Sequence, residues 1–421
     1  MAVKRWGAGK KRTFVTAMIV LTAIMLAIPA AALALPSETP DNTPMVDGRV
    51  RAIEQVGNNL WLGGRFTQVK QRNGTVLGNV GNVAVIDSQT NEYRQDFAPD
   101  LGGAGTEVWD IRRYGGTGPH ANDLLIAGTF TGDDANERNL VLVNGATGSV
   151  IRWYDSASLK TVLPAPNLTA PGGDGRVYAG GGSLSAFDFA NGNKLWTKSK
   201  SSVDPDIRDH KSAPAYRDLL LDGQAIWAAC VCDAVNGNPA KAMVKLELDG
   251  THVTSWYTET GSGAGSGAFG QAVLENNGKL YLAAGGSDFV AQYGKNNGGA
   301  PGWRRDTSGS TQALATMDNH LVVGGHFFEV GDGPGDNCGK GRPGDVDGQG
   351  NPVLDPKEEC ERRQGIAAYS FAGALDPDWD PKYQGGYSLV WALHVEGTRL
   401  HTGGEFKTVS RETQNSYARF S

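Results

Sequence analysis

The residues best suited to chemistry lie in a loop rich in glycine, proline and acidic side chains, between about residues 328 and 365. Its candidate ligands for a metal ion are Asp345, Asp347, Asn351 and Asp355. Ca²⁺ prefers oxygen ligands, which calcium loops supply at short, alternating intervals around a turn. This spacing predicts a calcium site, although Gln349 and Pro356 depart from the usual pattern. The alternative is an ordinary solvated acidic turn.

Four cysteines form the second informative group. Cys338 and Cys360 flank the loop, and we expect a disulfide between them that stabilises the fold by about 3 kcal/mol. Cys230 and Cys232 lie two residues apart on an expected strand, so both side chains point to one face. An extended chain separates such Cα atoms by about 6.6 Å, near the upper limit for a disulfide. These two cysteines are either buried thiols or a strained disulfide.

The sequence contains no HExxH motif, no GxSxG nucleophile motif and no phosphate-binding Walker A motif. Residues 265–270 match GxGxxG, but no helix is expected after them, so we interpret them as a connecting turn. No residue is assigned a catalytic role, and a binding protein is favoured over an enzyme.

The first 34 residues are organised like a secretory signal peptide. Five basic residues and no acidic ones precede a 22-residue stretch, residues 13–34, that is apolar apart from two threonines and ends in Ala32-Leu33-Ala34. Cleavage before Leu35 would give a secreted, extracellular protein. Alternatively, the stretch stays in place as an anchor, since about 20 apolar residues span a bilayer. No later segment is expected to contact a membrane.

Removal of this segment changes the net charge from −6 to −11. A surface this acidic argues against nucleic acid or anionic membranes as partners. We expect a monomer that binds a carbohydrate or protein ligand.

A repeated pattern runs through the rest of the chain, in which a short apolar run is followed by small residues. Aligned on the first small residue of each pair, the seven copies lie 41 to 79 residues apart. These residues are Gly63, Ala127, Gly180, Ala229, Ala283, Gly324 and Gly403. Small residues allow strands and neighbouring sheets to approach closely.

Each repeat is expected to hold four short strands, and the fourth carries an aromatic residue. These aromatic residues are Phe97, Trp153, Trp196, Trp256, Trp303 and Trp379. Four strands in about 50 residues correspond to one blade of a β-propeller. The sequence therefore predicts an all-β protein in which residues 35–421 form a single seven-bladed propeller.

The seventh repeat begins near Leu389 and has room for only three strands before Ser421. Residues 43–48 stand where other repeats have their fourth strand. We expect this N-terminal strand to close the last blade and so remove an open sheet edge.

These motifs, with pairs of small residues followed by Phe66, Phe130, Phe327 or Phe406, resemble the secreted actinobacterial β-propeller repeats of the delta-sixty type. The resemblance covers nearly all of the mature chain and implies the propeller fold. It implies no common chemistry, so no site residues are transferred from it.

The favoured hypothesis is therefore an exported propeller that binds a polysaccharide or a protein. The insertion follows the second strand of its blade, so it should project from the face where propellers commonly bind ligands. The alternative is an extracellular hydrolase or lyase with carboxylates at the mouth of the central channel. A structural surface component is a third possibility.

Overall fold

Short strands joined by tight turns make up the regular structure, and no helix occurs among the described residues. The computed structural model describes residues 35–95, 97–134, 136–168, 175–202, 216–223, 225–232, 234–235, 238–259, 268–333, 338, 360–387 and 389–421. The predicted signal segment, residues 1–34, lies outside this part of the chain. Within the described part, no helix is long and apolar enough to cross a membrane.

The main sheets follow one another along the chain, and each begins with an inner strand. The first three are β2 (Arg49–Val56), β3 (Asn59–Arg65), β6 (Val83–Asp87); β7 (Glu107–Arg113), β8 (Leu124–Thr131), β9 (Arg138–Val143), β10 (Val150–Trp153); and β11 (Leu159–Ala165), β12 (Arg176–Gly181), β13 (Ser183–Asp188), β14 (Lys194–Ser202), which continues to β17 (Ala234–Val235) and β18 (Asn238–Pro239). The next four are β15 (Tyr216–Asp222), β16 (Ala225–Cys230), β19 (Met243–Glu247); β20 (Phe269–Asn276), β21 (Lys279–Gly285), β22 (Phe289–Gly294), β23 (Trp303–Asp306); β24 (Thr311–Met317), β25 (His320–Gly325), β28 (Ile366–Ser370); and β30 (Val390–Glu396), β31 (Arg399–Gly404), β34 (Tyr417–Phe420).

Three small sheets accompany these. They are β1 (Met45–Val46), β4 (Gln68–Lys70), β5 (Val76–Asn79); β26 (Glu329–Gly331), β27 (Cys360–Arg362); and β29 (Tyr383–Gln384), β32 (Thr408–Val409), β33 (Glu412–Thr413).

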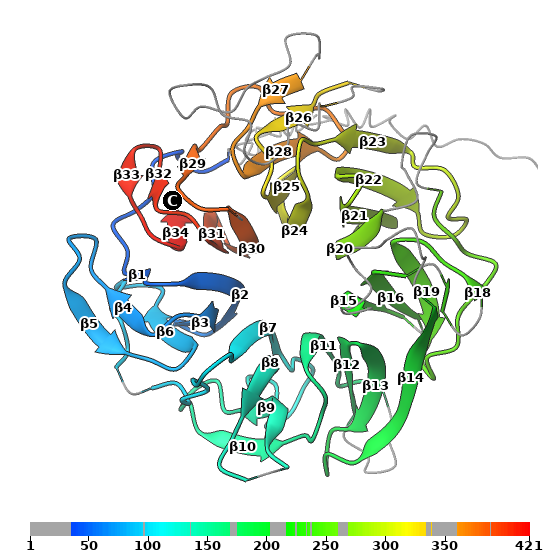
Figure 1. The fold of residues 1–421 in the computed structure, drawn as a ribbon, viewed down its shortest axis with the longest axis horizontal. Helices are drawn as coiled ribbons and strands as arrows, with labels where there is room; N and C mark the ends of the chain where they lie inside the picture. Colours follow the sequence, from blue (N-terminus) through cyan, green and yellow to red (C-terminus); the bar gives the residue numbers. More distant parts are fainter. Residues whose placement is uncertain are drawn as a thin grey trace, which may run out of the picture. The chain divides into compact units, whose positions relative to one another are not determined.

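The inner strands surround a common centre, with the other strands of each sheet further out (Figure 1). Each inner strand contacts the inner strand of the next sheet, in the order β2, β7, β11, β15, β20, β24, β30. Strand β30 also contacts β2, so the last main sheet packs against the first.

The small residues of the repeat pattern explain how neighbouring sheets pack. A Cβ atom on Gly63 of β3 would meet the Val108 side chain of β7, in the next sheet, at 2.5 Å. Gly403 of β31 packs in the same way against Val50 of β2, also at 2.5 Å. The pattern that identifies the repeats therefore marks the closest contacts between sheets, including the contact between the last sheet and the first.

The expected fourth strand forms in only part of the described structure. Strands β10, β14 and β23 occupy this position and carry Trp153, Trp196 and Trp303. Trp256 lies outside any strand, yet its ring packs on Trp227 with 4.6 Å between ring centroids. The aromatic residues are thus held by side-chain packing, whether or not the backbone around them pairs as a strand.

The N-terminal segment is placed differently from the prediction of a closing fourth strand over residues 43–48. Strand β1 pairs with β4, in the first part of the chain, and not with β34. The residues before β1 do follow β34, with hydrogen bonds from the Asp41 amide to the Arg419 carbonyl and from the Ser37 amide to the Ser421 carbonyl. Pro36, Pro40 and Pro44 interrupt this segment, and proline cannot donate the hydrogen bonds of a regular ladder.

The insertion leaves the sixth main sheet through β26 and returns through β27, which pair antiparallel. A disulfide joins Cys338 to Cys360, with 5.6 Å between their Cα atoms. A second disulfide joins Cys230 to Cys232, with Cα atoms 5.3 Å apart, and both cysteines are buried. Of the two alternatives for this pair, the structure therefore has the disulfide.

Candidate functional site

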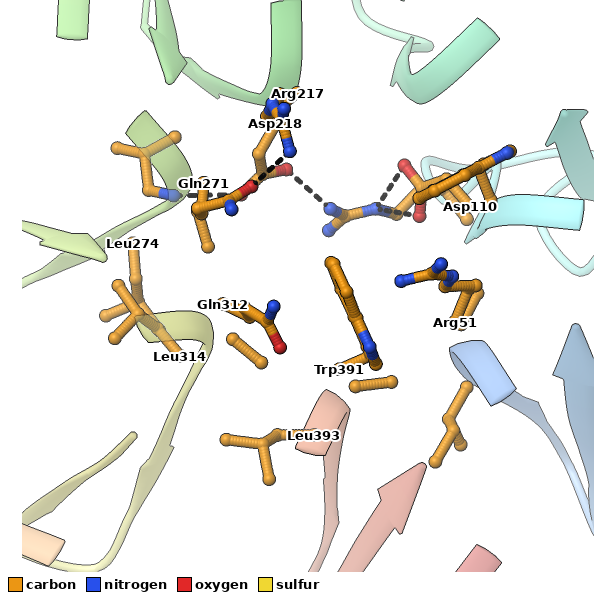
Figure 2. Close-up of a pocket in the computed structure, with 18 of the residues that line it drawn as sticks. Arg51, Asp110, Arg217, Asp218, Gln271, Leu274, Gln312, Leu314, Trp391 and Leu393 are labelled. Carbon is orange, nitrogen blue, oxygen red and sulfur yellow. Dashed lines mark hydrogen bonds and ion pairs between the residues drawn. The ribbon is translucent and has the colours of Figure 1, made fainter. Parts of the chain in front are cut away.

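A cavity of about 370 Å³ lies between the inner strands. Arginine, aspartate and tryptophan side chains gather on one side of it, and Leu274, Leu314 and Leu393 lie away from Arg51 and Asp110 (Figure 2). The cavity is thus lined by charged, aromatic and aliphatic groups that come from all parts of the repeat array.

A β-bulge occurs at the same register in every inner strand of the described structure. In β2, for example, Val50 pairs with Gly64 and Ala52 pairs with Gly63, so Arg51 is the extra residue. The bulge residues are Arg51, Trp109, Lys160, Arg217, Gln271, Gln312 and Trp391. Each of them lines the cavity, because a bulge re-aims the side chain of the extra residue. We call this set the bulge ring.

In five of the seven main sheets a glycine on the second strand faces the residue before the bulge, and Cys230 and Ala284 stand there in the other two. A Cβ atom on Gly64 would overlap the carbonyl group of Arg49, two residues before Arg51. Gly404 is related in the same way to Leu389, two residues before Trp391. The pair of small residues in each repeat is therefore the sequence signal that locates a cavity residue on the facing strand.

Cations and aromatic rings alternate along one side of the bulge ring. The Arg51 guanidinium lies between Trp109 and Trp391, 4.2 Å and 3.7 Å from their ring centroids. Its Nε donates to Glu107 at 2.8 Å. The Lys160 ammonium lies on Trp109, with Nζ 2.9 Å from the ring centroid. Such cation–π contacts hold a charged group in place while leaving its N–H donors available.

Burial shifts the acid–base equilibria of these cations. It lowers the pKa of Lys160 to about 7, with Arg51 and Arg217 adding repulsion and Glu107 opposing the shift. It also lowers the pKa of Arg217 to about 10, and the charge of Arg51 contributes. The charges of Arg51, Lys160 and Arg217 are therefore poorly solvated and repel one another, and an anion in contact with all three groups would be stabilised.

Two glutamines complete the bulge ring. Gln271 accepts a hydrogen bond from Arg217 at 2.7 Å. Gln312, which is 7% exposed, donates to His326 Nδ1 at 3.0 Å, and its Oε1 is buried without a partner. Arg51 Nη1 and the Trp391 indole nitrogen are buried and unpartnered as well. Unsatisfied polar atoms of this kind are uncommon in native interiors, and a ligand or water in the cavity can supply their missing partners.

Asp110 and Asp218 follow the bulge residues of β7 and β15 and bind a shared arginine. Arg112 donates to Asp110 at 3.0 Å and to Asp218 at 2.8 Å. Each carboxylate also accepts a backbone amide from the neighbouring sheet, Asp110 from Val162 at 3.0 Å and Asp218 from Val273 at 2.9 Å. These carboxylates connect adjacent sheets and are neutralised by Arg112.

The bulge ring and the residues at which the insertion begins lie at the same end of the inner strands. Strand β25 ends at Gly325, opposite the start of β24 at Thr311, and the insertion follows from there. His326, the next residue, stacks on Tyr387, with 5.7 Å between ring centroids. Tyr387 is 67% exposed, which gives this face an exposed aromatic side chain.

The predicted calcium ligands Asp345, Asp347, Asn351 and Asp355 lie outside the described residues. Among the residues that the structure describes, no group of three or more His, Cys, Asp or Glu side chains is arranged to hold a metal ion. The sequence pattern predicts the insertion and its disulfide but not the bulge ring.

Comparisons with known proteins identify the fold. No family model and no curated protein matches the chain. Solved structures match over most of its length: "Structure of U3-55K" (10% identity, TM-score 0.51, 91% of this chain and 99% of that one) and "Crystal structure of RRP9 WD40 repeats" (8%, 0.53, 92% and 98%). The computationally designed Ika8 protein also matches, with 14% identity, a TM-score of 0.48 and coverage of 91% and 99%.

WD40 repeats fold into β-propellers. This chain has a β-propeller fold. At these identities the likeness concerns the fold alone, and the chemistry of the cavity depends on the side chains of this chain.

Proposed function

We propose that this protein is an exported, monomeric, seven-bladed β-propeller that binds a protein or polysaccharide ligand at the bulge-ring mouth of its central cavity. The binding site comprises the bulge ring, the neighbouring Tyr387–His326 pair and the base of the insertion.

The blade number is supported by the order of contacts between inner strands. Strand β30 contacts β2 as the other inner strands contact their successors, and Gly403 packs on Val50 as Gly63 packs on Val108. Hydrogen bonds between residues 37–46 and the end of the chain support closure of the ring by its N-terminal segment, although this segment is not a regular strand.

Binding is supported above all by the bulge ring, because the same β-bulge in each inner strand points seven side chains, of four residue types, into one cavity. A hydrolase or lyase would need an acid and a base free to exchange protons. Asp110 and Asp218 are instead held by Arg112 and by backbone amides. Glu54 and Glu275 line the cavity too and accept the Arg113 and Gly278 amides, at 3.2 Å and 2.7 Å. The geometry therefore favours recognition over hydrolysis.

Export is supported by the signal-like organisation of residues 1–34 and by the two disulfides, which persist in oxidising compartments. The proposal includes cleavage before Leu35, with an N-terminal membrane anchor as the alternative.

We also propose that the insertion binds Ca²⁺ through Asp345, Asp347, Asn351 and Asp355. The disulfide between Cys338 and Cys360 brings the two ends of this loop together and would lower the entropic cost of ordering it. EDTA should then lower the melting temperature of the purified protein, and added Ca²⁺ should restore it. Equal melting temperatures with and without EDTA would contradict the calcium site.

The binding function is tested with peptide and glycan arrays probed by the protein that starts at residue 35. We expect selective binding, which Tyr387→Ala weakens at least tenfold. Tyr257, 51% exposed in the loop after β19, provides the matched control Tyr257→Ala, which should bind like the wild type. Binding that survives Tyr387→Ala and substitutions in the bulge ring would place the ligand elsewhere and overturn the proposal.

A further inference from the structure

The cavity contains more positive than negative charge at the level of the bulge ring. Arg51, Lys160 and Arg217 come from three bulges, and among the described residues Glu107 is the one carboxylate that pairs with any of them. Arg217 binds the neutral Gln271, and Lys160 contacts the face of Trp109. Glu54, Asp110, Asp218 and Glu275 also line the cavity, but they accept hydrogen bonds from Arg112 or from backbone amides, so the positive charge is concentrated at the bulge ring itself.

Two of these cations lie in the cavity wall and keep buried N–H groups without hydrogen-bond partners. Arg51 is 9% exposed, is fixed between two indole rings and keeps Nη1 without a hydrogen-bond partner. Arg217 Nε is likewise buried and unpartnered. An anion that accepts from these N–H groups would satisfy donors that are otherwise lost on folding.

Aliphatic side chains form another part of the lining, among them three leucines. Leu274, Leu314 and Leu393 lie two or three residues beyond the bulge positions of their strands, so they line a deeper level of the cavity. Figure 2 shows them away from Arg51. A ligand that extends from the three cations toward these leucines therefore meets an aliphatic surface on that side. Glu54 and Arg112, on other strands, and His394 line the cavity at the same level.

We propose that the cavity binds a carboxylate that is attached to an apolar group. The carboxylate binds Arg51, Lys160 and Arg217, and the apolar group packs on Leu274, Leu314 and Leu393. The shared chemistry belongs to free apolar acids and to the C-terminal residue of a polypeptide. This inference rests on the proposed binding function and specifies the group that the mouth of the cavity recognises.

An acidic sugar fits these observations less well. Sugar rings pack on free aromatic faces, but Lys160 and Arg51 already contact Trp109, and Arg51 contacts Trp391. Hydroxyl groups placed against the three leucines would lose their hydrogen bonds to water without replacement, which is unfavourable. Binding of an acidic sugar is therefore an outcome that would contradict the inference.

The experiment measures binding of small probes to the protein that starts at residue 35, by calorimetry. N-acetyl-leucine carries the carboxylate and the apolar group, N-acetyl-leucinamide lacks the charge, and acetate and glucuronate lack the apolar group. We expect N-acetyl-leucine to bind at least tenfold more tightly than each of the other three. Equal binding of the amide, or tighter binding of glucuronate, would overturn the inference.

Two variants locate the probe. Lys160→Met removes the charge and keeps the length of the side chain, and it should weaken N-acetyl-leucine binding at least tenfold. Lys245 also lies over an indole, 5.2 Å from the Trp227 ring, but does not line the cavity, so Lys245→Met should leave binding unchanged. Equal affinities of the wild type and Lys160→Met would contradict the assignment.

Two peptides with the same sequence, one with a free and one with an amidated C-terminus, distinguish the sources of the carboxylate. If the peptide with the free C-terminus binds more tightly than the amidated one, the ligand is a polypeptide. If N-acetyl-leucine binds and neither peptide does, the ligand is a free acid. If ligands from the arrays bind through Tyr387 while no carboxylate probe binds, this inference fails and the proposed function stands. If no array ligand depends on the mouth of the cavity, the proposed function fails.

Discussion

The Lys160 ammonium lies on the face of the Trp109 indole, with Nζ 2.9 Å from the ring centroid. These residues belong to β11 and β7, in adjacent sheets, and each is the bulge residue of its strand. The contact therefore depends on two bulges at the same register. It holds a lysine in a cavity where burial and two arginines work against its positive charge.

The stability contribution of Lys160 should depend on pH. Its pKa in the folded protein is lowered to about 7, below its ordinary value of 10.5, so between these values the unfolded chain binds more protons than the folded one. Wild-type stability should then rise with pH across this window, and the destabilising effect of the charged lysine is complete below pH 7. The gain in unfolding free energy from Lys160→Met should therefore be larger at pH 6.5 than at pH 10, by about 1–3 kcal/mol. The full pKa shift would give a larger difference, but solvent in the cavity screens part of the effect.

Urea unfolding of both proteins at several pH values measures this difference, with Lys245→Met as the matched control. A difference between wild type and Lys160→Met that is constant from pH 6.5 to pH 10 would show that the lysine is not desolvated in the folded state.

Gly404→Ala should destabilise the protein by about 1–3 kcal/mol, since the added Cβ would overlap the Leu389 carbonyl and displace the bulge at Trp391. Gly294→Ala is the matched control, because a Cβ on Gly294 meets no atom within 4 Å. The control should lie within about 0.5 kcal/mol of the wild type. Chemical unfolding measures the unfolding free energies of the wild type and the two variants. Equal stability of the two variants would show that the second small residue is not needed for the bulge.

The sequence predicts the repeats because their apolar runs and small residues serve local needs. Gly63 and Gly403 must be small so that the next sheet can approach, and this requirement recurs once per repeat. The bulge residues have no common type: Arg51, Trp109 and Gln271 occupy the same position. The small residues recur in each repeat and can be recognised in the sequence, whereas the bulge residues differ in type from one repeat to the next and cannot.

Other misses have different physical causes. Prolines keep residues 36–44 out of a regular ladder, so the expected closing strand is replaced by separate hydrogen bonds to β34. The position of Asp218 next to Arg112 depends on two sheets, those of β15 and β7, meeting at the centre, which spacing along the chain does not reveal. The Cys338–Cys360 disulfide was predictable because both cysteines flank one loop.

Deletion of the N-terminal segment should weaken the junction between the ends of the described chain. Arg419 binds Asp41 at 2.6 Å, and the Trp379 indole donates to the Pro36 carbonyl at 2.9 Å. A protein that starts at residue 45 loses these bonds and the amide contacts to β34, each of which contributes about 0.5–1.5 kcal/mol. We expect a lower unfolding free energy and more aggregation through the exposed edge of β34.

Urea unfolding and light scattering compare the stability and aggregation of this shorter protein with those of the protein that starts at residue 35. Equal stability and solubility of the two forms would show that residues 35–44 do not contribute to closing the fold.

Asp218→Ala should destabilise the protein while leaving carboxylate binding at the bulge ring intact. The change removes one partner of Arg112 and the acceptor for the Val273 amide, which lie in different sheets. We expect a loss of about 1–3 kcal/mol, moderated because 41% of the Arg112 side chain is exposed to solvent. Asp222→Ala, on the same strand, breaks only the partly exposed ion pair with Lys295 and should cost less than about 1 kcal/mol.

A double-mutant cycle of Asp218→Ala with Arg112→Leu separates this linking role from a direct role in binding. If the carboxylate acts through Arg112, the double variant should be more stable than the sum of the single losses implies, by about 0.5–3 kcal/mol. N-acetyl-leucine should bind Asp218→Ala as it binds the wild type, because the bulge residues keep their own contacts. A tenfold loss of binding in Asp218→Ala at unchanged stability would instead make Asp218 part of the recognition site.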